Sequence, residues 1–229
     1  MIKLKQKPFE EIADSIAKYD AVLNIGCGGC ASVCLAGGQR EIVVLNAQLD
    51  RHFKRMGQPK RLAEYTLERA CNSIFFPDLD QLVSSYDCLI SMACSAGVQF
   101  IAERYQHIPV YPAINTHGIG VDRELGVYEE VCKGCGQCVI GYTGGICPLT
   151  NCAKKLFNGP CGGTNDGSCE VSGDVPCAWH AIYTRLHNQG RLEDIFKIHP
   201  VMEWRDQVRR RVVQEEYRPV QPPPGKRFR

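Results

Sequence analysis

Short apolar runs alternate with segments of helical spacing through the first half of the chain. Helical patterns at 49–57, 77–86 and 96–105, and one around Phe9, Ile12 and Ile16, separate runs rich in β-branched residues. Those runs predict strands at 21–25, 41–45, near 65, 87–91 and 109–113. Such alternation is typical of a parallel sheet with right-handed crossovers. Residues 1–120 are therefore expected to form a small doubly wound α/β domain.

The pattern changes at about residue 121, where glycine, proline and cysteine become dominant as far as residue 177. Neither a helical nor a strand period continues there, so we expect an irregular domain that metal binding helps to fold. Helices are predicted at 177–190, 191–199 and 202–214, followed by an extended basic tail rich in proline. The second predicted domain, residues 121–229, is thus a cysteine-rich metal-binding domain with C-terminal helices.

Composition narrows the range of functions. The 229 residues carry a net charge of +2, which gives no global field for nucleic acid or membranes. The N-terminal segment lacks the apolar region of a signal peptide, and no apolar run could span a bilayer. We therefore expect a cytoplasmic protein. Because cytosolic thiols stay reduced, its 14 cysteines indicate metal ligands rather than disulfides.

A first group of cysteines follows the first predicted strand. Cys27, Cys30 and Cys34 are spaced C-x2-C-x3-C, so a helix starting here would bring the three thiols to one side. Cys94 follows the fourth predicted strand. In a sheet of order 3-2-1-4-5, the first and fourth strands are neighbours, and their carboxyl ends form the usual ligand crevice. These four cysteines are the predicted ligands of a first metal centre.

Two alternatives to this first site remain. The segment "GCGGCA" also fits the dinucleotide-binding pattern G-x-G-x-x-A, although no acidic residue ends the predicted second strand at 41–45. Cys71 could replace Cys94, because it too follows a predicted strand. Cys88 lies inside a strand and is interpreted as a small buried apolar residue.

A second group of eight cysteines occupies the C-terminal half: Cys132, Cys135, Cys138, Cys147, Cys152, Cys161, Cys169 and Cys177. The opening "CKGCGQC" has the C-x2-C-x2-C form of bacterial ferredoxins, and Pro148 follows Cys147 as proline follows the fourth ferredoxin cysteine. We group Cys132, Cys135 and Cys138 with a distant cysteine, and Cys147, Cys152, Cys161 and Cys169 around a second metal.

Twelve thiols would hold up to three [4Fe–4S] clusters. Zinc is the alternative at one or more sites, because zinc ribbons also use C-x2-C pairs. No catalytic motif accompanies the thiols, and the six histidines are scattered. The chain therefore has the residues of an electron relay rather than those of an independent enzyme.

Two segments carry a family resemblance: "CGGCASVCLAGGQREIVVL" and "GQCVIGYTGGICPLTNCAKKLFNGPCGG". They resemble the small cysteine-rich subunit, of the MetV type, of two-subunit methylenetetrahydrofolate reductases. The second segment is similar to the C-terminal domain associated with that reductase. The resemblance implies a cytoplasmic subunit that pairs with a flavin-bearing TIM-barrel subunit in one-carbon metabolism of the acetyl-CoA pathway. It is compatible with iron–sulfur clusters or zinc.

We accordingly expect a non-catalytic subunit that relays electrons from ferredoxin or a larger reductase complex to the partner's flavin. A zinc-stabilised scaffold of the same complex is the main alternative. A zinc module that binds nucleic acid is disfavoured, because the chain lacks a basic surface interleaved with aromatic residues.

Overall fold

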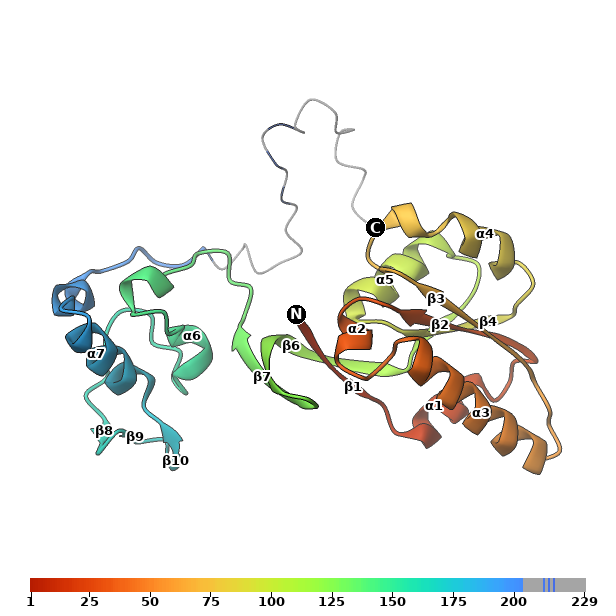
Figure 1. Ribbon diagram of the computed structural model, residues 1–229, viewed down its shortest axis with the longest axis horizontal. Coiled ribbons are helices and arrows are strands. Elements are labelled where there is room, and N and C mark those ends of the chain that lie inside the picture. The colour runs from red at the N-terminus through yellow and green to blue at the C-terminus, as the bar shows by residue number, and fades with distance from the viewer. Residues whose placement is uncertain (204–211, 213, 215, 217–229) are drawn as a thin grey trace. The chain divides into compact units, whose positions relative to one another are not determined.

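The computed structural model describes residues 1–203, 212, 214 and 216, and the chain divides into two compact units, Met1–Lys133 and Gly134–Arg229 (Figure 1). The boundary predicted at residue 120 falls inside a strand, and the first unit continues to Lys133. Within the described part of the chain, none of the helices combines the length and the apolar character that a bilayer crossing requires.

The first unit is built on a four-stranded parallel sheet of order β3-β2-β4-β5. Its strands are β2 (Ala21–Cys27), β3 (Arg61–Leu67), β4 (Cys88–Met92) and β5 (Val110–Pro112). Every residue of β2 and β4 is buried, as expected for central strands that are covered on both faces.

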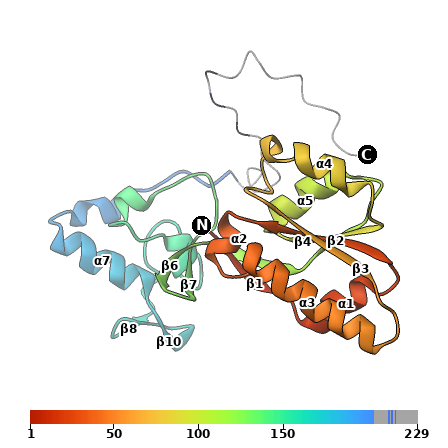
Figure 2. The same ribbon diagram turned by 45° about the vertical axis from the view of Figure 1, so that its right-hand side comes forward.

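Helices cover both faces of this sheet, which confirms the doubly wound α/β prediction. Helices α1 (Phe9–Ile16) and α3 (Gln39–Arg55) lie on one face, and α4 (Pro77–Val83) and α5 (Ser95–Arg104) on the other (Figures 1 and 2). A short helix, α2 (Cys30–Val33), follows β2, and a 3-10 turn, η1 (Ser73–Phe75), precedes α4.

The strand predicted at 41–45 is wrong, because these residues belong to α3. Their β-branched composition suggested a strand, but the buried residues are Ile42, Leu45, Leu49 and Phe53, which recur at the spacing of one helix face. Val44, in contrast, is 51% exposed. Without a strand at 41–45, β3 pairs directly with β2, and the carboxyl end of β3 lies beside the end of β2.

A second, antiparallel sheet of order β1-β6-β7 completes the first unit. Its strands are β1 (Ile2–Gln6), β6 (Ile114–Glu124) and β7 (Val127–Cys132). The expectation of irregular structure from residue 121 onwards is therefore wrong for the hairpin formed by β6 and β7. Gly126, with φ of 80°, makes the tight turn between them.

The second unit consists of short elements, as predicted for an irregular cysteine-rich domain. They are η2 (Ile140–Tyr142), α6 (Pro148–Asn151), β8 (Thr164–Asn165), β9 (Ser168–Cys169), β10 (Ser172–Pro176), α7 (Ala178–Asn188) and η3 (Leu192–Phe196). Trp179, Ile182 and Leu186 of α7 form its buried apolar cluster. So small a core contributes little free energy of folding by itself.

The C-terminal helices are confirmed in part. Helix α7 corresponds to the helix predicted at 177–190, whereas 191–199 contains only the 3-10 turn η3. The helix predicted at 202–214 and the extended tail lie outside the described residues, apart from 202, 203, 212, 214 and 216.

Gly37→Ala should destabilise the first unit. A Cβ at Gly37 would collide with the carbonyl oxygen of Met92 and would lie 2.5 Å from Ile114 Cδ1. Overpacking of this kind costs about 1–3 kcal/mol. Thermal unfolding followed by circular dichroism should show a lower melting temperature, while the control Gly173→Ala, whose Cβ meets nothing within 4 Å, should melt like the parent. Equal melting temperatures for all three proteins would contradict this packing.

Candidate metal centres

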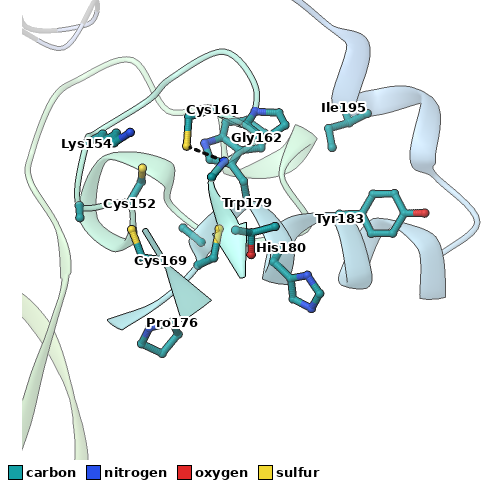
Figure 3. Close-up of a pocket in the computed structure, with 16 residues that line it drawn as sticks. Cys152, Lys154, Cys161, Gly162, Cys169, Pro176, Trp179, His180, Tyr183 and Ile195 are labelled. Carbon is teal, nitrogen blue, oxygen red and sulfur yellow. Dashed lines mark hydrogen bonds between the residues drawn. The ribbon is translucent and has the colours of Figure 1, made fainter. Parts of the chain in front are cut away.

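Four cysteines of the second unit line one cavity of about 290 Å³ (Figure 3). Cys152 follows α6, Cys161 lies in the loop before β8, Cys169 ends β9, and Cys177 precedes α7. Short elements far apart in this unit's sequence thus bring four thiols to one cavity. Cys177 completes the group in the place that the sequence analysis gave to Cys147, which is not among the cavity-lining residues.

Hydrogen-bond donors beside Cys177 favour the ionised form of this one thiol. Partial burial opposes ionisation of Cys177, but the backbone N–H groups of His180 and Trp179 and the Thr164 hydroxyl outweigh it, and the pKa of Cys177 is lowered. The N–H groups belong to the first turn of α7, where the helix dipole also favours negative charge. These contacts would stabilise a thiolate at this position.

A charged pair and a glycine lie beside Cys161. Its Sγ is 3.6 Å from Glu170 Oε1 and accepts a hydrogen bond of 3.4 Å from the backbone N–H of Gly163. Glu170 also forms an ion pair with Lys154, another residue that lines the cavity. Hydrogen bonds to ligand sulfur tune the properties of a bound metal.

The cavity and the small apolar core of the second unit are continuous. Cys152 and Cys177 pack against the Trp179 cluster, and Trp179 Nε1 donates a 3.1 Å hydrogen bond to the carbonyl oxygen of Leu156. Trp179 also lines the cavity. Any group that ties the four thiols together would therefore also hold α7 in place.

The ferredoxin-like cysteines are distributed over both units. Cys132 ends β7 in the first unit, and Cys135 and Cys138 lie in the loop that begins the second. Cys135 Sγ approaches the carbonyl oxygen of Gln137 at 3.7 Å. Cys147 precedes α6, and its Sγ accepts a 3.4 Å hydrogen bond from Thr150 Oγ1.

The N-terminal cysteines lie where the sheet order predicted, at the carboxyl ends of β2 and β4. Cys27 ends β2, Cys30 begins α2, and Cys94 precedes α5. Strands β2 and β4 are paired neighbours, with Gly26 opposite Met92. Cys34, the fourth predicted ligand, differs: its thiol is buried and donates a 3.1 Å hydrogen bond to the carbonyl oxygen of Ile2 in β1.

Cys71, which the sequence analysis left as a substitute for Cys94, lies near the other N-terminal thiols. Partial burial of its sulfur, followed by the negative potential of Cys94, Cys27 and Cys30, raises the pKa of Cys71, although the residue as a whole is exposed. A helix predicted at 41–45 would have placed the strand near residue 65 next to the first strand. Cys71 would then have been expected beside Cys27.

The glycine loop after β2 does not have the form of a dinucleotide site. Glu68 follows β3, so an acidic residue does stand at the end of the strand beside β2. However, the helix after the glycines has only four residues, and the space beside Gly28 is taken by the chain itself, since a Cβ there would lie 3.3 Å from the carbonyl oxygen of Glu68. In a dinucleotide site that space admits the pyrophosphate.

A zinc ion and an iron–sulfur cluster require different distances between their ligand sulfurs. Among the described residues, no three His, Cys, Asp or Glu side chains are grouped as ligands of a metal ion. Tetrahedral zinc requires sulfurs about 3.8 Å apart, given Zn–S bonds of about 2.3 Å. The thiolates of a [4Fe–4S] cluster lie farther apart, because each binds a different iron.

Comparison with known proteins gives one match. Residues 111–205 match a family model described as methylene-tetrahydrofolate reductase C terminal. The matched segment contains all four cysteines of the cavity and begins after the N-terminal cysteines. No curated protein and no solved structure matches the chain. Residues 111–205, which include the end of the first unit and most of the second, are thus similar to the C-terminal region of methylenetetrahydrofolate reductases.

Cys88 should be chemically inert in the folded chain. It has no exposed surface, and burial, reinforced by the carboxylate of Asp87, raises the pKa of its thiol to about 12. Because the thiolate is the reactive form, iodoacetamide at about pH 8 should leave Cys88 unmodified in native protein and label it in guanidinium. Tryptic mass spectrometry measures both. Labelling at the same rate in the two states would contradict the burial of β4.

Proposed function

We propose that this chain is an iron–sulfur electron-transfer subunit of a methylenetetrahydrofolate reductase complex. The observation that carries the proposal is the cavity of the second unit, where four cysteines converge within the segment similar to the reductase C terminus. The flavin-bearing partner subunit would bind and reduce the folate, and ferredoxin or a larger reductase complex would supply the electrons.

The residues of the cavity suit a bound cluster. Cys152, Cys161, Cys169 and Cys177 would be its ligands, and a [4Fe–4S] cluster would supply one-electron chemistry there. The N–H groups at the start of α7 and the N–H of Gly163 would face ligand sulfur and stabilise its negative charge. The protein would thereby set the potential at which the group accepts an electron.

Iron–sulfur is favoured over zinc by the ferredoxin-like opening C-x2-C-x2-C of the second cysteine group. The twelve predicted ligands would also divide evenly into three sets of four. The alternative, a zinc-stabilised scaffold of the same complex, would use the same four thiols to fold the second unit.

Anaerobic purification of the full chain, followed by iron, acid-labile sulfide and zinc analysis, tests the proposal. We expect iron and sulfide in equal amounts, broad visible absorbance and an EPR signal after reduction with dithionite. Cys177→Ser should lose about four irons per chain, one [4Fe–4S] cluster. The matched control Cys88→Ser should keep the parent's iron content, because Cys88 is buried in β4 and does not line the cavity. Zinc without iron would overturn the electron-transfer function in favour of the scaffold.

Electron transfer itself needs the partner. When the dithionite-reduced chain, freed of excess reductant, is mixed anaerobically with an oxidised flavin-bearing methylenetetrahydrofolate reductase subunit, flavin absorbance should bleach. The Cys177→Ser variant should reduce the flavin more slowly, because it lacks one cluster of the electron path. Unchanged bleaching in a variant shown to lack that cluster would remove the cavity from the electron path.

A further inference from the structure

Three parallel strands of the first unit end at one edge of the sheet, and a cysteine lies at or just beyond each end. Cys27 pairs with Leu67, the last residue of β3, and Gly26 pairs with Met92, the last residue of β4. Because the register is continuous, the loops after β2, β3 and β4 leave the sheet side by side. They carry Cys27 with Cys30, Cys71, and Cys94, respectively.

The loop that carries Cys71 packs closely on the loop that carries Cys27 and Cys30. The backbone N–H of Gly28 donates a 2.8 Å hydrogen bond to the carbonyl oxygen of Leu67. A Cβ at Gly29 would lie 3.8 Å from Arg69 Cγ and 3.7 Å from Cys27 Sγ. A Cβ at Gly28 would lie 3.3 Å from the carbonyl oxygen of Glu68, so the two loops approach most closely there.

A second glycine brings Cys71 towards Cys94. A Cβ at Gly97 in α5 would lie 2.9 Å from both the Ala70 and the Ala93 side chains, so these two buried alanines lie against the same point of the helix. Each alanine is followed directly by a cysteine, Cys71 in one loop and Cys94 in the other. The first turn of α5 therefore fixes the positions of both loops.

Hydrogen bonds hold the ends of these loops. The N–H of Cys27 donates to the carbonyl oxygen of Gly37 at 2.9 Å. The N–H of Ser95, next to Cys94, donates to Thr116 Oγ1 at 2.9 Å, and Asn72, next to Cys71, accepts a 3.2 Å bond from Ile74 N–H. The ligand loops are thus ordered by contacts of the protein itself, which is typical of a preorganised site.

Cys34 has a different role. It is 4% exposed, its thiol bonds to Ile2, and its neighbour Val33 accepts a 3.1 Å hydrogen bond from the Tyr128 hydroxyl. These contacts join the end of α2 to β1 and β7. Cys34 therefore packs in the interior against β1. Cys27 is also buried but ends β2 at the sheet edge, where Cys71 is exposed and Cys30 and Cys94 are partly exposed.

We infer that Cys27, Cys30, Cys71 and Cys94 are the four ligands of a metal cluster at the carboxyl edge of the parallel sheet, and that Cys34 is a structural thiol. The inference depends on the proposed function only for the identity of the cluster. Four thiolates from three loops would suit a [4Fe–4S] cluster. It lies outside the segment similar to the reductase C terminus. Its exposed ligand, Cys71, gives the cluster an outward side where an electron could enter or leave.

Two matched variants of the full chain test this ligand set. Cys71→Ser removes the inferred ligand, and Cys34→Ser removes the thiol of the predicted C-x2-C-x3-C motif while keeping a donor for Ile2. Each protein is purified anaerobically, checked for folding by circular dichroism, analysed for all bound metals and sulfide, and examined by EPR after reduction with dithionite. Cys71→Ser should lose about four irons per chain and the corresponding EPR signal, and Cys34→Ser should keep both.

The outcomes separate this inference from the proposed function. Full iron in Cys71→Ser together with lost iron in Cys34→Ser would overturn the ligand set while leaving an iron–sulfur protein. If the parent holds zinc instead of iron, the proposed function fails. Loss of about one zinc in Cys71→Ser, but not in Cys34→Ser, would still support the four inferred ligands. A parent chain without any bound metal would overturn both. If Cys71→Ser does not fold, Cys34→Ser decides by itself: full metal content supports Cys34 as a structural thiol, and loss of about four irons overturns the inferred ligand set.

Discussion

The in-register pairing of β2 with β3 on one side and β4 on the other is the constraint on which the first unit depends. Both central strands are buried on both faces, and a slip of one residue would exchange which side chains each face receives. The same pairing makes three strands end together. The convergence of Cys27, Cys71 and Cys94 therefore follows from burial of the sheet, before any metal binds.

The sequence predicted most of this sheet, because its strands are apolar runs with helical segments between them. It failed at 41–45, where valine and isoleucine favour a strand but the spacing of Ile42, Leu45 and Leu49 is helical, and the longer pattern decided the structure. That error also left Cys71 as only a substitute for Cys94, since a strand at 41–45 would have separated β3 from β2. Cys34 was chosen by its spacing from Cys30, but the four-residue helix α2 ends there and its thiol meets β1 instead.

The second unit was harder to predict, because its order does not come from apolar periodicity. Its short strands and turns surround one small cluster on α7, and loop conformations depend on contacts that no local pattern encodes. The sequence predicted the helix at 178–188 and missed that Cys177 shares a cavity with Cys152, Cys161 and Cys169. Cys177 shares the cavity with the other three cysteines because the pairing of β8, β9 and β10 folds the chain back on itself.

The two four-thiol sites differ in what a metal would contribute. In the first unit a continuous apolar core, with residues such as Leu23, Leu89 and Ile101 fully buried, orders the ligand loops, so a metal would enter a site that already exists. In the second unit the ligands and the core share α7, and the core alone is small, so metal binding and folding would be one event. Cys94 and Cys177 nevertheless occupy the same position, immediately before a helix of ten or more residues. The same local position would therefore place a ligand in a preformed site in one unit and in a site that folds together with its metal in the other.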